Sequence, residues 1–149
     1  MKAVIQRVNR ASLRVNDQLV SKISKGEVVL LGVASEDSQK DVEIMVEKLK
    51  NIRIFSDKEG KTNLSIKDID GEMLLVSQFT LLADLDKGRR PSFMNAARPD
   101  HANELYIKVI DSLKNDGIKV ATGVFKEHMQ IELENDGPVT FVFDTKRDS

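Results

Sequence analysis

A short polar stretch, Ser77-Gln78-Phe79-Thr80, ends a run of residues that is otherwise apolar. Residues 72–80 are predicted as a strand, whose alternation would place Ser77 and Phe79 on one face and Gln78 and Thr80 on the other. Main-chain N–H groups at a strand end are free of the sheet ladder and can stabilise a developing oxyanion. Phe79 would then offer an apolar or stacking wall, and the hydroxyls would orient a substrate. The alternative is purely structural: a buried Phe79 with threonine present for packing.

A Gly-Pro dipeptide lies near the C-terminus, within Asn135–Thr140. Residues 129–134 alternate apolar and polar side chains, and residues 139–143 are β-branched and aromatic, so we expect a hairpin with Gly137-Pro138 at its tip. Glycine permits unusual backbone angles, and proline fixes its own φ and makes a cis peptide accessible. Such a tip can present rigid main-chain atoms to a ligand. From the dipeptide alone an ordinary trans turn is the default, because only about 5–6% of X-Pro bonds are cis.

The usual catalytic machinery is missing from the chain. Its two histidines, His101 and His128, have no metal-type spacing such as HExxH, and a histidine-based triad stays a minor alternative. The absence of cysteine excludes disulfides, thiolate zinc sites and cysteine nucleophiles. The glycines lack GxGxxG and Walker spacing. We therefore expect no metal and no cofactor.

Composition predicts one domain over residues 1–149, long enough to bury a core without crosslinks. The 23 basic and 24 acidic side chains leave a net charge of −1, so no DNA partner is expected and any RNA contact must be local. The N-terminus carries charge too early for a signal peptide, and no apolar run approaches the roughly 20 residues of a membrane span. A cytoplasmic protein with no membrane partner is the simplest interpretation.

The predicted elements form an α/β domain of mainly antiparallel β-sheet with two main helices. β-branched and apolar runs predict an N-terminal meander of three strands, and helical periodicity predicts one helix before and one after the strand that ends in Thr80. A last β region follows the second helix. The boundaries are strands over 3–15, 18–23 and 27–33, helices over 38–54 and 99–115, and β structure from 119 onward.

The segment from 84 to 99 has no periodicity and is predicted to be a long loop, a kind of segment that is often functional in compact domains. It carries Lys87, Arg89 and Arg90, which are candidate contacts for the phosphates of an RNA. The alternative is that these three charges are simply solvated.

Four stretches, taken together and in order, closely resemble the D-aminoacyl-tRNA deacylases. They span nearly the whole chain: Met1–Val8, Ser77–Thr80, Arg90–Phe93 and Asn135–Thr140. The resemblance implies a homodimeric α/β fold with active sites at the subunit interface. It also implies hydrolysis of the ester between a D-amino acid and the acceptor end of tRNA, which is a chiral proofreading step in translation.

The resemblance also implies roles for particular residues. Ser77–Thr80 would line the pocket, and Gly137 and Pro138, joined by a cis peptide, would reach into the pocket of the partner subunit and reject L-amino acids sterically. Arg7 would support the orientation of that pair. Because the side chain of glycine is only a hydrogen atom, glycyl-tRNA should be cleaved too. The chain departs from the family at Phe125-Lys126-Glu127-His128, where the family tends to have small residues after the phenylalanine, so we expect local contacts to differ there.

Two mechanisms stay open for this reaction. In one, Thr80 attacks the ester and forms an acyl-enzyme. In the other, the 2′-hydroxyl of the terminal adenosine helps to activate water while main-chain N–H groups near Phe79 hold the oxyanion. We favour the second mechanism because no general base lies near Thr80 in the sequence. The rival functions are a non-catalytic binding module and a general acyl hydrolase that ignores the RNA.

Overall fold

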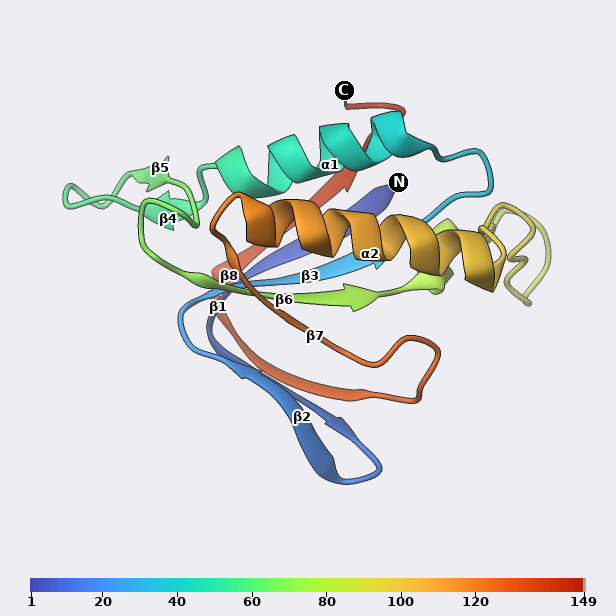
Figure 1. The fold of residues 1–149 in the computed structure, drawn as a ribbon, viewed down its shortest axis with the longest axis horizontal. Coiled ribbons are helices and arrows are strands. Elements are labelled where there is room, and N and C mark those ends of the chain that lie inside the picture. The colour runs from blue at the N-terminus through green and yellow to red at the C-terminus, as the bar shows by residue number, and fades with distance from the viewer. Residues whose placement is uncertain (149) are drawn as a thin grey trace.

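A six-stranded sheet with two helices on one of its faces forms the body of the protein (Figure 1). The computed structural model describes residues 1–148. A small hairpin of two further strands projects beyond the end of the first helix (Figure 1). The elements are β1 (Lys2–Val15), β2 (Gln18–Ile23), β3 (Gly26–Gly32), α1 (Gln39–Asn51), β4 (Phe55–Ser56), β5 (Thr62–Leu64), β6 (Glu72–Ser77), the 3-10 helix η1 (Phe79–Leu82), α2 (Pro99–Asn115), β7 (Lys119–Thr122) and β8 (Gln130–Asp144).

The large sheet is mixed: most of its strand pairs are antiparallel, as predicted, but two are parallel. β1 pairs antiparallel with β2, β3 and β8, but β3 pairs parallel with β6, and β6 pairs parallel with β7. The two parallel pairs arise because α1 and α2 each cross over the same face and return the chain in its original direction. The predicted helices and strands are present in the structure. The local sequence pattern did not predict which strands pair in parallel.

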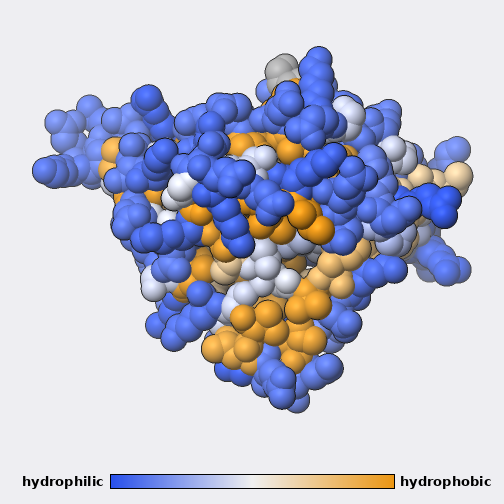
Figure 2. Space-filling model, viewed as in Figure 1, coloured by the Kyte–Doolittle hydropathy of each residue, from blue (hydrophilic) through white to orange (hydrophobic). Residues whose placement is uncertain are grey.

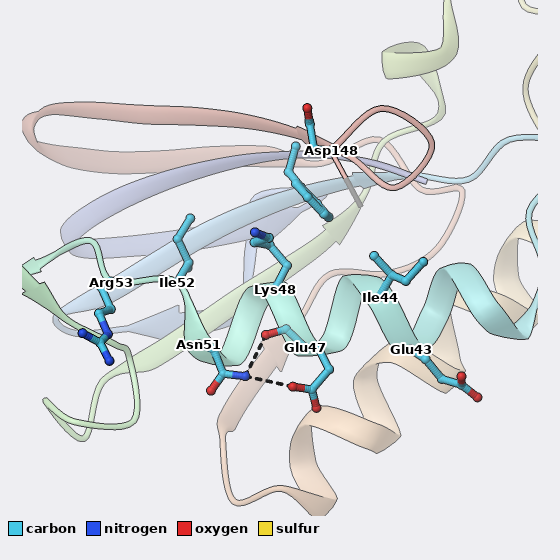
Figure 3. A pocket seen from close by; sticks show the side chains of 9 residues that line it. Glu43, Ile44, Glu47, Lys48, Asn51, Ile52, Arg53 and Asp148 are labelled. Carbon is cyan, nitrogen blue, oxygen red and sulfur yellow. Dashed lines mark hydrogen bonds between the residues drawn. The ribbon is translucent and has the colours of Figure 1, made fainter.

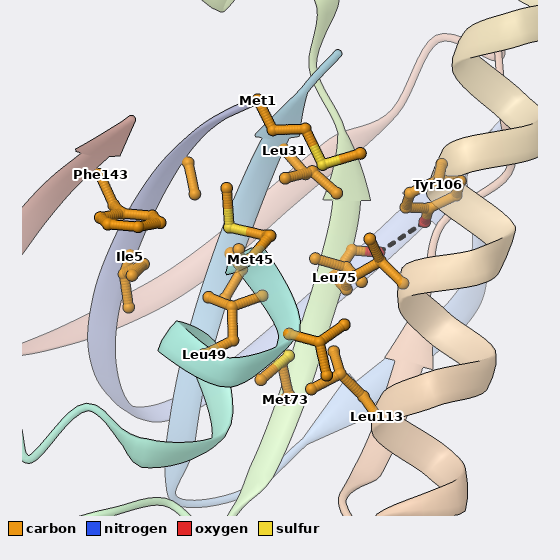
Figure 4. Close-up of a cluster of buried hydrophobic side chains, with 14 of the residues drawn as sticks. Met1, Ile5, Leu31, Met45, Leu49, Met73, Leu75, Tyr106, Leu113 and Phe143 are labelled. Atoms are coloured by element: carbon orange, nitrogen blue, oxygen red, sulfur yellow. Dashed lines mark hydrogen bonds between the residues drawn. The ribbon is translucent and has the colours of Figure 1, made fainter. Parts of the chain in front are cut away.

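The main core lies between the sheet and the two helices, where Figure 4 shows its side chains meeting. The helical periodicity is confirmed, since α1 buries Met45 and Leu49 and α2 buries Tyr106 and Leu113. The Tyr106 hydroxyl donates a hydrogen bond of 2.7 Å to the carbonyl oxygen of Leu75, so this buried phenol is satisfied on β6. Burial raises the pKa of Tyr106 to about 12. α2 is thereby tied to the strand that ends in the Ser77 motif.

A second, smaller core lies on the opposite face of the sheet. It is formed by apolar side chains of β1, β2, β3 and β6, with Val28 and Leu74 at its centre and Met129, Ile131 and Leu133 packed against it. Consecutive residues of β3 therefore enter different cores, Val28 the smaller and Val29 the larger. This confirms that β3, with its continuous apolar run, is covered on both faces.

One acidic residue, Glu27 on β3, is buried without a hydrogen-bonding partner within residues 1–148. It lies opposite Arg7 in the β1–β3 register and beside Met73 of β6. Its relative exposure is 0%, and within residues 1–148 neither carboxyl oxygen has a hydrogen-bond partner. This burial raises the pKa of Glu27 to about 8, so the side chain is an uncharged carboxylic acid at neutral pH.

Glu27 should make the protein less stable as pH rises. Its pKa is about 8 in the folded state against an ordinary 4.5, so between these values the folded state holds a proton that the unfolded state has lost. The free energy of unfolding should therefore fall with rising pH, by up to about 1.4 kcal/mol per unit from this group. Glu27→Gln should flatten that dependence and stabilise the protein at about pH 8.

Urea denaturation at about pH 5 and about pH 8 measures the effect. The exposed Glu132→Gln on β8 is the matched control and should keep the wild-type pH dependence. Equal pH slopes for wild type and Glu27→Gln would show that Glu27 titrates normally in the folded state.

Candidate functional site

The Ser77-Gln78-Phe79-Thr80 stretch lies where β6 leaves the sheet. Ser77 pairs with Leu31 as the last residue of the β3–β6 register, and the Gln78 N–H donates a hydrogen bond of 2.8 Å to the carbonyl oxygen of Leu31. The chain then turns into η1, so the predicted strand alternation over 77–80 is wrong. The alternation fails because a 3-10 turn has three residues per turn, whereas a strand has a period of two.

The turn leaves two N–H groups without a partner inside it. Its first hydrogen bond runs from the Leu81 N–H to the carbonyl oxygen of Gln78, at 3.3 Å. The N–H groups of Phe79 and Thr80 precede that bond and therefore have no acceptor within the turn. The Thr80 hydroxyl oxygen accepts a hydrogen bond from the Gln78 side-chain amide. The motif thus offers main-chain donors at the end of a strand, as its sequence predicted.

Phe79 is not a core residue. Its side chain is 55% exposed and meets Phe93 edge to face, with ring centroids 5.0 Å apart. The structural alternative of a buried phenylalanine is therefore wrong. Phe93 belongs to the Arg90–Phe93 stretch, so two of the four sequence motifs touch each other here.

A pocket of about 510 Å³ opens beside this pair of aromatic rings. Four segments surround it: the residue after β3, the end of β6, the approach to and first turn of α2, and the turn between β7 and β8 with the start of β8. Ser77, Gln78 and Phe79 line it, whereas Thr80 does not. The other lining residues are Val33, Val76, Phe93, Ala96, Ala97, Pro99, Ala102, Phe125, Lys126, Glu127, His128, Met129 and Ile131.

The Gly-Pro dipeptide lies in a bulge of one long strand, and the predicted hairpin is wrong. Gln6 pairs with Thr140 and Val8 pairs with Asn135, so β8 inserts the residues 136–139 opposite a single residue of β1. Both flanking runs had the period of a strand, as predicted, but they pair with the same neighbour instead of with each other. The extra residues are expelled from the ladder.

The side chain of Asn135 holds the backbone of the bulge. The peptide bond between Gly137 and Pro138 is cis, as the family resemblance implies, and both residues are exposed. A Cβ atom on Gly137 would collide with the backbone and side chain of Val139, so only glycine fits. The Asn135 side chain spans the bulge, accepting from the Val139 N–H at 2.7 Å and donating to its carbonyl oxygen at 3.0 Å.

Arg7 connects the bulge to the rest of the fold. Its Nε donates a hydrogen bond of 2.9 Å to the carbonyl oxygen of Asp136 and lies 3.3 Å from the Asp136 carboxylate. Its Nη1 donates a hydrogen bond of 2.8 Å to the carbonyl oxygen of Ile54, just before β4. The sequence analysis named Arg7 but did not predict that Asn135 and Asp136 hold the bulge in place. Their residue types could have indicated this role, since Asn and Asp side chains commonly form hydrogen bonds with local backbone groups.

The three basic candidates Lys87, Arg89 and Arg90 lie on an exposed loop. A two-way bridge between Asp84 and Ser92 closes the loop, with N–O distances of 2.8 and 3.0 Å. The loop therefore joins η1 directly to Phe93 at the pocket. Within residues 1–148 none of the three basic side chains makes an ion pair, so all three are free for an external anion.

The single chain does not bring all the predicted residues together. Gly137 and Pro138 do not line the pocket that contains Ser77–Phe79. Large apolar side chains are exposed near both regions: Leu85 and Met94 near the pocket, Val142 beside the bulge. Figure 2 shows apolar surface gathered on the strand lobe below the helices as well, where β2 exposes large apolar side chains.

Two further features are separate from this site. A groove of about 720 Å³ runs along α1, and Figure 3 shows that both charged and apolar side chains line it, with the Asn51 amide bonded to Glu47. None of the predicted site residues lines it. His101 is occupied structurally, since its Nε2 lies 2.9 Å from the carbonyl oxygen of Asp37. No helix within residues 1–148 is long and apolar enough to cross a membrane.

Comparison with known proteins defines the class. The family model of D-Tyr-tRNA(Tyr) deacylases matches residues 4–144. The D-aminoacyl-tRNA deacylase of Clostridium perfringens is 49% identical over 147 residues, which is 99% of each chain. The solved structure of a c-Myc DNA Unwinding Element Binding Protein superposes with a TM-score of 0.91 at 40% identity, covering 97% of this chain and 98% of that one. A probable eukaryotic D-amino acid tRNA deacylase shares the fold, with a TM-score of 0.82 at 21% identity over 95% of this chain and 97% of that one.

The protein is therefore a hydrolase that acts on aminoacyl-tRNA. It belongs to the D-Tyr-tRNA(Tyr) deacylase family.

Loss of Arg7 should loosen the Gly137-Pro138 bulge. Arg7→Gln removes the ion pair with Asp136 and at least one hydrogen bond of a charged donor, each worth about 1.5–3 kcal/mol. Amide hydrogen exchange in the segment 134–141 should accelerate at least about 10-fold, because local opening becomes easier. Arg10→Gln, which removes an exposed pair with Glu134 on the same two strands, should leave that exchange near wild type. Equal exchange rates in the two variants would refute the anchoring role of Arg7.

Proposed function

We propose that this deacylase releases D-amino acids and glycine from tRNA at a site that two subunits complete. Ser77, Gln78, Phe79 and Thr80 of one subunit form the catalytic part, and Gly137 and Pro138 of the partner subunit form the part that selects chirality. The observation that carries this proposal is the separation of the two motifs: in one chain the pocket and the bulge are both exposed, and the bulge does not line the pocket.

The surface chemistry supports assembly into a homodimer. Phe79 is 55% exposed and Met94 is 90% exposed near the pocket. Val142, which follows the bulge on β8, is 62% exposed. Exposed large apolar groups of this kind mark interaction surfaces. In a two-fold dimer one surface contacts its equivalent on the other subunit, so each bulge would enter the other subunit's pocket and both sites would be the same.

The free main-chain donors of η1 support the assignment of the reacting centre. The N–H groups of Phe79 and Thr80 have no acceptor in the turn and would bind the oxyanion that forms when the ester carbonyl is attacked. Attack by water forms a new C–O bond, and collapse of the intermediate breaks the ester bond and returns a proton to the ribose oxygen. The products are the free amino acid and tRNA.

The 2′-hydroxyl of the terminal adenosine would assist the attacking water. The Thr80 hydroxyl is engaged by the Gln78 amide, which is not a base, and no carboxylate or imidazole bonds to it within the described chain. A threonine nucleophile requires an adjacent general base. We therefore assign Thr80 the role of positioning the substrate. The proton transfers are assigned to the 2′-hydroxyl of the RNA and to water.

Chirality would be read by main-chain atoms. An exposed Gly-Pro pair without a bulky side chain can contact the amino group and Cα substituents of any amino acid, whereas an L side chain would point into the same space and be rejected. Arg7 would hold the pair in place through Asp136. Selection of this kind ignores the identity of a D side chain.

The RNA contact would be local. Lys87, Arg89 and Arg90 are exposed, and their loop leads into the pocket residue Phe93, so they are placed to meet phosphates of the acceptor end. The net charge of −1 agrees with a protein that grips a few terminal nucleotides. The substrate, and thus the enzyme, would be found in the cytoplasm.

The first prediction of this proposal concerns chirality. The purified enzyme should deacylate D-tyrosyl-tRNA and glycyl-tRNA and leave L-tyrosyl-tRNA intact, because only an L side chain is rejected. Release of labelled amino acid measures the three rates. A simple D-tyrosine ester should be a poor substrate, which separates this enzyme from a general acyl hydrolase. Intact glycyl-tRNA under conditions that fully deacylate D-tyrosyl-tRNA would contradict the steric filter, and tight binding without turnover would indicate a binding module.

The second prediction concerns the nucleophile. Thr80→Ala should retain most of the activity on D-tyrosyl-tRNA, whereas a substrate that ends in 2′-deoxyadenosine should react about 100-fold or more slowly with either enzyme, since it lacks the assisting hydroxyl. Single-turnover rates on the two substrates give the comparison. An inactive Thr80→Ala together with a fully reactive 2′-deoxy substrate would instead establish an acyl-enzyme.

A further inference from the structure

The turn between β7 and β8 is fixed against the strand that bears the Ser77 motif. Phe125 in this turn stacks on Tyr106 with ring centroids 6.2 Å apart, and the Tyr106 hydroxyl bonds the carbonyl oxygen of Leu75 on β6. The turn is also closed by a hydrogen bond of 3.2 Å from the Glu127 N–H to the carbonyl oxygen of Val124. The residues that follow Phe125 therefore have a defined place at the pocket.

Lys126 has an unusual backbone conformation at this place. Its φ is +70°, in the left-handed region that costs a residue with a Cβ atom roughly 1–2 kcal/mol. Glycine would adopt this conformation without strain. Backbone stability therefore does not explain why a lysine stands there, and its side chain is the feature to account for.

The Lys126 ammonium is available at the rim of the pocket. The residue is exposed, lines the pocket with Ser77 and Phe79, and makes no ion pair within residues 1–148. Its neighbour Glu127 also lines the pocket, so the rim is not generally basic and would not attract an anion by its average charge. The site offers one mobile positive charge on a flexible stem, which suits a single phosphate group.

We propose that Lys126 binds a phosphate of the acceptor end, the one attached to the nucleotide whose ester is cleaved. This inference rests on the proposed function, which places the aminoacylated ribose beside Phe79. That ribose carries its phosphate one sugar away from the reacting carbonyl, within reach of a lysine on the same rim. Lys87, Arg89 and Arg90 do not line the pocket, so Lys126 is a contact from a different segment of the chain.

Steady-state kinetics on two substrates test the proposal. The first is D-tyrosyl-tRNA, and the second is adenosine esterified with D-tyrosine, which has no phosphate. Lys126→Gln should raise KM for the tRNA about 3- to 10-fold with little change in kcat, and it should reduce the slope of log KM against log salt by about 1. The effect on the adenosine ester should be much smaller. Lys126→Arg should restore the KM of wild type.

Two further variants separate the charge from other effects. Lys126→Gly relaxes the left-handed backbone and removes the charge, so it should raise KM as Lys126→Gln does while folding normally. Lys58→Gln removes an equally exposed lysine at the β4–β5 hairpin and should leave KM unchanged. Equal KM values for Lys126→Gln and Lys58→Gln, or equal changes on both substrates, would overturn the proposal. A wild-type enzyme that fails to hydrolyse D-tyrosyl-tRNA would instead refute the proposed function.

Discussion

The contact between Arg7 and Asp136 is the interaction on which the Gly137-Pro138 half of the candidate site depends. Arg7 lies on β1, opposite the residues of β8 that leave the ladder. Its Nε donates a hydrogen bond of 2.9 Å to the carbonyl oxygen of Asp136, and its Nη1 donates one to the carbonyl oxygen of Ile54. Without it the bulge would be a solvated loop with only Asn135 to shape it. The proposed selection of chirality by Gly137 and Pro138 requires a rigid bulge, because a small misplacement of contacting atoms costs much of the selectivity.

The other half of the candidate site, around Ser77–Thr80, depends on main-chain N–H groups that do not bond within the sheet. β6 ends at Ser77, and the 3-10 turn that follows exposes the N–H groups of Phe79 and Thr80 next to a pocket with an aromatic wall. An activated ester needs modest stabilisation of its transition state, so two preorganised donors and the substrate's own hydroxyl can suffice. In the proposed mechanism, a member of this hydrolase family therefore needs neither a cysteine nucleophile, which the sequence lacks, nor a histidine triad.

The sequence was sufficient for the parts of this picture that depend on local pattern. Helical periodicity located α1 and α2, and the polar end of an apolar run located Ser77, Gln78 and Phe79, which line the pocket. Prediction from the sequence failed where the structure depends on pairing between segments that are distant in the chain. The Gly-Pro dipeptide is compatible with a hairpin or a bulge, and only the common partner β1 distinguishes them. Glu27 is buried because β1 and β6 pair with β3 on either side of it. These strands are distant in the sequence, so the residues around Glu27 do not predict its burial.

The central claim, a site shared by two subunits, can be tested by mixing two inactive variants. Phe79→Pro removes one N–H donor at a position where proline is tolerated, and Gly137→Ala introduces the clash with Val139. Each homodimer should be inactive, but a heterodimer would contain one site with both intact parts. Subunit exchange at equal amounts, verified by native mass spectrometry, should therefore restore about one quarter of wild-type activity. Mixtures that contain heterodimers yet stay as inactive as the separate variants would contradict the account.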